Sequence, residues 1–135
     1  EQIHQVFLNL MLNAVNAMPR GGSLAVSVKQ IKETDRPASS ARLKRKHDAE
    51  KDKPLIQVSF KDTGAGIKEK DLSRVFNPFF TTDPNGTGLG LPIAHRLLER
   101  NDADIFITSK PGHGCRVTLI LPAADPVNDI RRKSD

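Results

Sequence analysis

The N-terminal part of the chain is dominated by hydrophobic residues, and three asparagines interrupt the pattern at Asn9, Asn13 and Asn16. At about 100° per residue, the three amides fall within about 60° of one another on a helix. The other faces are apolar: one carries Ile3, Val6, Phe7, Leu10, Ala14 and Ala17, and the other carries Leu8, Leu12 and Val15. A helix that is apolar nearly all round is expected to be buried.

Buried amides need partners, because each unpaired polar group costs about 1–3 kcal/mol. A single asparagine is usually satisfied by nearby loop backbone or by water, and that interpretation stays open here. Three amides in register, together with the glycine-rich loops later in the chain, favour a ligand or an ion as their partner.

Four short runs rich in hydrophobic residues predict β-strands at residues 23–31, 55–60, 105–108 and 115–121. In the first run, Leu24, Val26 and Val28 alternate with small or polar residues, so we expect a half-buried strand. The turn Pro111-Gly112-His113-Gly114 joins the last two runs and predicts a hairpin. The first two runs are expected to pair as another hairpin with a long loop.

Two further helices are predicted between the pairs of strands. Residues 68–75 form a short polar helix, and a longer helix follows the glycine-rich residues 86–91. The longer helix has Pro92 in its first turn and ends at Asn101-Asp102, residues that tolerate the left-handed cap conformation. This order of elements predicts an α+β fold, a two-layer α/β sandwich in which helices cover one face of a mixed sheet.

The charge is concentrated in one segment of this 135-residue chain, whose net charge is +5. Residues 29–53 carry nine basic and five acidic side chains and no aromatic residue. We interpret residues 29–54 as a charged, mobile insertion in a domain that spans residues 1–122, with a tail at residues 123–135. Nucleic-acid binding through the basic side chains is the alternative, but a nucleic-acid partner is not expected because no aromatic ring is available for base stacking.

Cys115 is the only cysteine, which excludes an internal disulfide and fits a reducing compartment. Since it lies in a predicted strand, we expect an inert, half-buried thiol. No apolar run reaches the roughly 18 residues needed to span a bilayer, so no membrane segment is expected in this chain. The chain begins at Glu1 and shows no signal-peptide pattern, so we expect a domain of a longer protein.

Two glycine-rich motifs carry the candidate chemistry. Asp62-Thr63-Gly64-Ala65-Gly66-Ile67 lies between a strand and a helix, where an aspartate can accept from an exocyclic amine and glycines let a flat ring approach the backbone. Gly86-Thr87-Gly88-Leu89-Gly90-Leu91 opens a helix and exposes backbone amides at its positive end, which favours an anion. Its spacing fits neither a P-loop nor a Rossmann motif, and a flexible hinge is the alternative interpretation.

Together with the asparagine helix, these motifs resemble the histidine-kinase ATPase domain of the GHKL superfamily, which has the Bergerat fold. The resemblance covers nearly the whole chain apart from the insertion and the tail. It is carried by the segments Asn9 to Ala14, Asp62 to Ile67, Phe76-Asn77-Pro78-Phe79-Phe80, Gly86 to Leu91 and Gly112-His113-Gly114. Phe79-Phe80-Thr81-Thr82 is most similar to nitrogen-regulatory sensor kinases.

The resemblance implies ATP and Mg²⁺ as cofactors, and it implies a role for each matching residue. Asp62 would hold the adenine amino group, Thr118 would reach the base through water, and Asn13 would be the metal ligand. The second glycine loop would wrap the phosphates beneath a mobile lid. The implied ATP-binding residues are Asn9, Asn13, Asn16, Asp62, Gly64, Gly66, Ile67, Thr81, Thr82, Gly86, Thr87, Gly88, Leu89, Gly90 and Thr118. No residue is expected to act covalently.

The sequence departs from the family pattern at three places. The lid position that usually carries a lysine is Asp83, whose charge is unfavourable beside phosphate. Asp102-Ala103 stands where relatives have two glycines before a strand, and Asn16 replaces a basic residue. Asp83 supports an alternative interpretation, in which the chain is a degenerate nucleotide-binding module that docks or inhibits without phosphotransfer.

One residue separates kinases from hydrolases in this superfamily. Gyrase-type and MutL-type relatives use a glutamate, one turn before the metal-binding asparagine, to activate water, and Asn9 occupies that position here. The resemblance therefore implies transfer of the γ-phosphoryl group to a protein histidine. The acceptor would lie on an upstream dimerisation domain, since none of His4, His47, His95 and His113 fits that role. A response regulator would be the downstream partner, and the location would be cytoplasmic.

Overall fold

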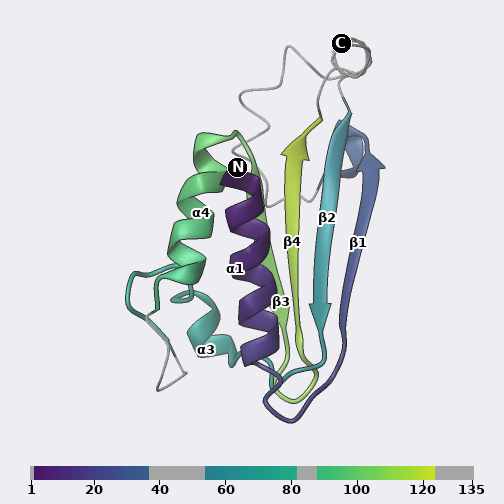
Figure 1. Ribbon diagram of the computed structural model, residues 1–135. Helices are drawn as coiled ribbons and strands as arrows, with labels where there is room; N and C mark the ends of the chain where they lie inside the picture. Colours follow the sequence, from purple (N-terminus) through teal and green to yellow (C-terminus); the bar gives the residue numbers. More distant parts are fainter. Residues whose placement is uncertain (1, 37–53, 82–87, 124–135) are drawn as a thin grey trace.

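The fold is built around one face of a β-sheet, against which two helices pack (Figure 1). The computed structural model describes residues 2–36, 54–81 and 88–123. The helices are α1 (Gln2–Asn16), α3 (Glu69–Leu72) and α4 (Gly90–Arg100), with a 3₁₀ turn η1 (Glu33–Asp35). The strands are β1 (Leu24–Ile31), β2 (Leu55–Asp62), β3 (Asp104–Ser109) and β4 (Cys115–Pro122). The predicted two-layer α+β sandwich with its helices on one face of the sheet is confirmed.

The strands lie in the order β1-β2-β4-β3, and each of the three pairings is antiparallel. The prediction of a mixed sheet is therefore wrong for the strands that the structure describes. Strands β2 and β3 run in the same direction, as do β1 and β4, but another strand lies between the members of each pair. Both predicted hairpins are confirmed, as β1 pairs with β2 and β3 pairs with β4.

The strand register gathers chemically useful residues at one end of the sheet. Leu24 faces Asp62, Asp62 faces Cys115, and Cys115 faces Ser109 across three successive pairings. At the opposite end, Ile31 faces Leu55. Since the turn between β3 and β4 and the loop after β2 both leave from the end with Asp62, these two segments meet there.

The core lies between the helices and the strands' shared inner face. Its fully buried members include Val6 of α1, Leu98 of α4 and Leu119 of β4. Phe7 and Phe60 add an edge-to-face ring contact with centroids 5.5 Å apart. Helix α4 contributes Ala94, Leu97 and Leu98 to this core, and all three are buried.

Helix α1 is buried on one face only, contrary to the sequence-based prediction. Val6, Leu10 and Ala14 are buried, whereas Leu8, Leu12 and Val15 are 53%, 49% and 57% exposed. The helix lies on the surface of the sheet beside α4, so these two neighbours contact one side of it and leave the other open (Figure 1). An apolar pattern all round the helix was therefore not a sign of complete burial.

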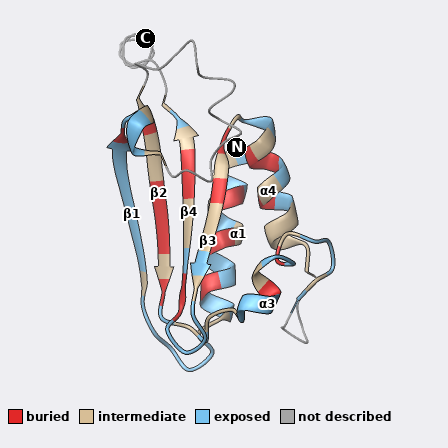
Figure 2. Cartoon of the chain, turned by 180° about the vertical axis from the view of Figure 1, so that it is seen from behind, coloured by how far each residue is buried: buried red, intermediate tan, exposed pale blue. Residues whose placement is uncertain are grey.

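Strand β1 is also more exposed than predicted. Val26 and Val28 point toward the helix side of the sheet, in register with Phe60 and Val58, yet they are 49% and 65% exposed. The reason is the strand order: β1 is an edge strand at the side of the sheet farther from α1 and α4 (Figure 2).

The remaining boundaries differ little from the predictions. Strand β2 extends to Asp62, and α3 is shorter than the predicted helix over residues 68–75. Asp102 has φ of 56°, which confirms a left-handed end after α4. The start of the predicted insertion is ordered, since β1 continues to Ile31 and η1 follows, while residues 37–53 and the tail from residue 124 lie outside the described residues.

None of the helices in the described ranges is long and apolar enough to cross a membrane.

Candidate functional site

The first glycine loop begins where β2 ends, and its conformation depends on Asp62. This carboxylate is buried, and its Oδ1 accepts a hydrogen bond from the Gly64 backbone N–H at 2.8 Å. The next amide, that of Ala65, donates to the Ala17 carbonyl just beyond α1 at 3.4 Å. The loop is thus attached to both the sheet and the C-terminal end of α1, and one carboxylate oxygen of Asp62 remains for another donor.

The glycine loop and the β3–β4 turn interlock so closely that two positions require glycine. Gly66 has φ of 76° and Gly114 has φ of 78°, in the region that side chains rarely adopt. A Cβ on Gly66 would collide with the Lys110 carbonyl, and one on Gly114 would collide with the Asp62 carbonyl. The Gly112 amide donates to the Ala65 carbonyl at 2.7 Å, which joins the two segments directly.

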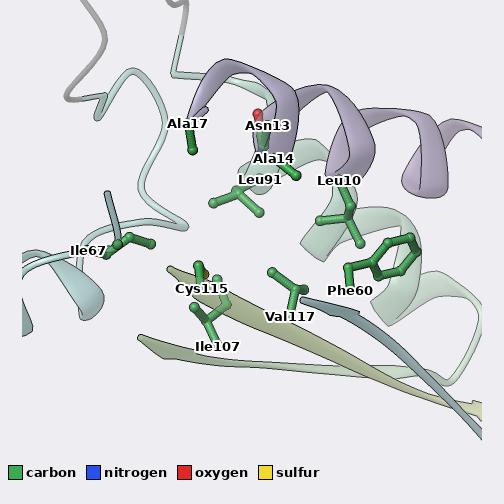
Figure 3. Close-up of a pocket in the computed structure, with 11 residues that line it drawn as sticks. Leu10, Asn13, Ala14, Ala17, Phe60, Ile67, Leu91, Ile107, Cys115 and Val117 are labelled. Atoms are coloured by element: carbon green, nitrogen blue, oxygen red, sulfur yellow. The ribbon is translucent and has the colours of Figure 1, made fainter. Parts of the chain in front are cut away.

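A pocket lies between α1, this loop, the start of α4 and the inner face of the sheet (Figure 3). Its walls are mainly aliphatic, and Asn13 is the only amide side chain among the lining residues. A slot with apolar walls and a few polar groups at its rim fits a flat, mostly apolar ring. The lining residues are Leu10, Asn13, Ala14, Ala17, Phe60, Gly66, Ile67, Leu91, Ile107, Cys115 and Val117.

The three asparagines of α1 do not share one environment. Asn13 lines the pocket, and its Oδ1 lies 3.5 Å from the position that a Cβ on Gly90 would occupy. Asn9, one turn earlier, donates from Nδ2 to the Gly90 carbonyl at 3.5 Å. Asn16 is exposed and does not line the pocket. The structure therefore brings two of the three amides together beside the first residue of α4.

The second glycine loop is described from Gly88 onward. The Gly88 carbonyl accepts a hydrogen bond from the Phe79 amide at 2.9 Å, and α4 begins at Gly90, so its first backbone amides lie next to Asn9 and Asn13. Thr81 is exposed. The predicted site residues Thr82, Gly86 and Thr87, as well as the lid residue Asp83, lie outside the described residues.

The placement predicted for Thr118 is wrong. Successive side chains of a strand point to opposite faces of the sheet. The pocket is lined by Cys115 and Val117, so Thr118 points to the other face, as does Ile120, which belongs to a separate cluster with Ile31 and Leu55. The period-two alternation of β4 was the signal that could have selected Cys115 and Val117 from the sequence.

Cys115 is buried beside Asp62, at the floor of the pocket. Burial raises the pKa of its thiol from 9.0 to about 11, and the negative charge of Asp62 adds to the rise. A hydrogen bond with Ser109 and the positive charge of Lys61 act in the opposite direction, with smaller effects. The expectation of an inert thiol is confirmed, because this group stays protonated at neutral pH.

The raised pKa of Cys115 predicts slow thiol chemistry in the folded protein. At pH 8, we expect a disulfide reagent such as DTNB to react about 100-fold more slowly with the folded chain than with the chain in denaturant, since two pKa units separate the two thiols. The rate in the folded protein should keep rising with pH up to about 11, whereas the rate in denaturant should level off near 9.0. Equal rates at pH 8 would contradict the burial of this thiol, and the lone cysteine makes the assay specific to one site.

Comparison with known proteins identifies the family of this chain. A sequence profile described as "Histidine kinase-, DNA gyrase B-, and HSP90-like ATPase" matches residues 1–125. The chain belongs to this ATPase family. Gly66 and Ile67 of the first glycine motif, and Leu91 of the second, are among the residues that line the pocket.

Within this ATPase family, the similar sequences include sensor kinases. The chain is 31% identical over 130 residues to sporulation kinase E of Bacillus subtilis, and 33% identical over 122 residues to the signal transduction histidine-protein kinase AtoS of Escherichia coli. These alignments cover 96% and 90% of the chain but only 15% and 17% of the relatives. The chain thus spans less than a fifth of the length of these two curated relatives.

Solved structures of this ATPase family share the fold. The catalytic domain of histidine kinase ThkA is 26% identical, with a TM-score of 0.64, and the match covers 90% of this chain and 66% of that one. The mycobacterial sensor histidine kinase MprB matches with a TM-score of 0.68 at 23% identity, over 90% of this chain and 70% of that one. The sandwich is therefore the Bergerat fold of histidine-kinase catalytic domains.

Proposed function

We propose that this chain is the ATP-binding catalytic domain of a sensor histidine kinase, and that residues 1–122 form the working unit. It binds Mg-ATP and supplies the γ-phosphoryl group to a histidine on a dimerising helical domain of its parent protein. The observation that carries the choice of kinase over hydrolase is Asn9, whose amide donates to the Gly90 carbonyl at 3.5 Å. An amide cannot take a proton from water, so hydrolysis lacks a general base at the position where hydrolysing relatives place a glutamate.

The pocket supports adenine as the base. An adenine ring would lie between Leu91 on one side and Ile107 with Val117 on the other. Asp62 is not itself a lining residue, but it is paired with the lining residue Cys115, and its second carboxylate oxygen would accept from the adenine amino group. An anionic acceptor gives a stronger hydrogen bond than a neutral one. The aliphatic walls exclude water, which strengthens that bond further.

Asn13 is the residue that we assign to magnesium. An amide oxygen is a ligand that Mg²⁺ accepts, and Asn13 lines the pocket beside Gly90, whose missing side chain leaves room at that point. Among the described residues, no group of three or more His, Cys, Asp or Glu side chains is placed to hold a metal. A single amide oxygen, that of Asn13, fits an ion that takes one protein ligand and otherwise binds phosphates and water. When bound, Mg²⁺ neutralises charge on the phosphate oxygens.

The phosphates are assigned to the start of α4. The backbone amides of Leu89 and Gly90 lie at the positive end of this helix, where anions are stabilised. Thr81 and the loop that contains Thr82, Gly86 and Thr87 would complete the phosphate site as a lid. Catalysis would then consist of orienting the γ-phosphoryl group and spreading its charge, without a covalent bond to this domain.

The phosphoryl acceptor is a histidine outside this chain. His4 and His113 are exposed and do not line the pocket, and His95 stacks on Phe76 with ring centroids 4.8 Å apart. In the transfer, an imidazole nitrogen forms a bond to the γ-phosphorus while the bond to the bridging oxygen breaks, and ADP leaves. The phosphoryl group would pass on to a response regulator. Because ATP is supplied in the cytoplasm, we expect the domain to act there.

Titration with a fluorescent adenine nucleotide, with and without Mg²⁺, tests the proposal. We expect saturable binding that is tighter when Mg²⁺ is present and is competed by ATP. The absence of saturable binding rules the proposal out. If binding is tight but the parent kinase transfers no phosphoryl group to its histidine, the degenerate docking module is the correct interpretation instead.

A further inference from the structure

The last residue of β3, Ser109, connects two segments that surround the pocket. Its hydroxyl oxygen accepts a hydrogen bond from the Ile67 backbone N–H at 2.7 Å and donates one to the Gly114 carbonyl at 2.8 Å. The first distance is short for an N–H···O bond, the second is usual for an O–H···O bond, and Ser109 is half-buried, which limits the access of competing water. One side chain thus bonds to the glycine loop and to the β3–β4 turn at the same time.

Both partners of Ser109 adjoin the pocket. Ile67 is a lining residue itself, and Gly114 precedes the lining residue Cys115. Ser109 is directly opposite Cys115 in the sheet. Ser109 is not itself a lining residue, but its hydroxyl bonds to the backbone beside residues that are.

The other hydrogen bonds of the glycine loop show why this contact matters. The amides of Thr63 and Ala65 donate to carbonyls of Ser23 and Ala17, on the side of β1 and α1. The Ile67 amide is the donor that reaches β3, on the other side of the pocket. Among the described residues, two hydrogen bonds hold the loop against the β3–β4 side of the pocket: the bond between Gly112 and Ala65, and the bond from Ile67 to Ser109.

We propose that Ser109 is a positioning residue for nucleotide binding, which fixes the Ile67 end of the glycine loop in the conformation that receives the base. This inference rests on the proposed function, since it assigns the pocket to adenine. Without the hydroxyl, the Ile67 amide has no acceptor on β3, and the loop spends less time in the binding conformation. The apparent dissociation constant rises in inverse proportion to that fraction.

The test is nucleotide affinity in the variant Ser109→Ala. We expect the dissociation constant for a fluorescent ADP analogue to rise about tenfold, equivalent to about 1.4 kcal/mol. Ser109→Thr keeps the hydroxyl and suits a strand, so it should restore the affinity to within about twofold of the original chain. Thr108→Ala removes a neighbouring hydroxyl that is exposed on the same strand, and it should leave the affinity unchanged.

A second measurement begins with the unmodified chain, so its first part does not depend on any variant folding. Amide hydrogen exchange in the unmodified chain should show Ile67 protected relative to the exposed Lys68 that follows it, and Ser109→Ala should remove that protection. A purely structural role would lower the melting temperature of Ser109→Ala and Ser109→Thr alike, without rescue of affinity by threonine.

The outcomes are distinguishable. If the unmodified chain binds no adenine nucleotide, the proposed function fails. If it does bind, each of three results overturns the role of Ser109 alone. The first is an unchanged nucleotide affinity in Ser109→Ala, and the second is a Ser109→Thr variant that binds as weakly as Ser109→Ala. The third is an Ile67 amide that exchanges as freely as the amide of Lys68.

Discussion

Replacing Asp62 with asparagine is expected to weaken adenine nucleotide binding by about 100-fold. The asparagine carbonyl can still accept from the Gly64 amide, as Oδ1 of Asp62 does at 2.8 Å, so the loop keeps its conformation. The other acceptor oxygen becomes an NH₂ group that faces the adenine amine, donor against donor. Losing a hydrogen bond to a charged acceptor and burying an unpaired donor each cost about 1–3 kcal/mol, and about 2.8 kcal/mol is a factor of 100.

Isothermal titration with ADP measures this effect, and Asp104→Asn is its matched control. Asp104 is half-buried in β3 and its Oδ1 also accepts one backbone amide, from Ile105 at 2.9 Å, but it lies at the far end of the strand from Ser109. The control should bind ADP as the unmodified chain does. An Asp62→Asn variant whose affinity stays within threefold would show that Asp62 does not contact the base.

Replacing Asn13 with alanine is expected to reduce phosphotransfer in the parent kinase by about 1,000-fold, or about 4 kcal/mol of transition-state stabilisation. The change removes the one amide oxygen that lines the pocket and that we assign to Mg²⁺. Asn13 is exposed on a helix and alanine is the strongest helix former, so the fold should be unaffected. Transfer is measured as radioactive phosphate incorporated from labelled ATP into the kinase.

The decisive comparison for Asn13 is between nucleotide affinities with and without the metal. In the variant, Mg²⁺ should no longer improve ATP binding, while ADP binding without Mg²⁺ should change by less than about threefold. Gln5→Ala removes an exposed amide from the same helix and serves as the control with normal transfer. An Asn13→Ala variant that keeps its Mg²⁺ response would remove Asn13 from the metal site.

The sequence predicted the elements well because their local signals are strong. The turn at residues 111–114 and the pattern of strand, glycine loop and helix around Asp62 each fixed a boundary to within a few residues. The predictions of burial were weaker. Leu12 and Val28 are apolar but exposed, because burial depends on which elements lie beside α1 and β1, and strand order cannot be obtained from the periodicity of a single segment.

The site was predictable only in part for a related reason. Asn13, Gly66 and Ile67 were selected by motif and do line the pocket. Thr118 was assigned to the wrong face of β4. A motif gives the order of residues along the chain, but it does not say which face of the sheet each side chain points to. Ser109 was missed altogether, since its role comes from two backbone contacts with distant segments, which leave no pattern in the sequence.

The antiparallel register of β1 and β2 has a consequence for how this domain can vary in length. With Ile31 opposite Leu55 at one end and Leu24 opposite Asp62 at the other, the connection after β1 departs about 23 Å from the glycine loop, at about 3.3 Å per residue along the strand. The described ends of that connection lie at the other end of the sheet from the pocket, so a change in its length is expected to leave the pocket residues in place. The β3–β4 turn has no such freedom, because Gly112 and Gly114 contact the loop itself. Protein engineers who need to graft a reporter into this domain should therefore choose the join between β1 and β2.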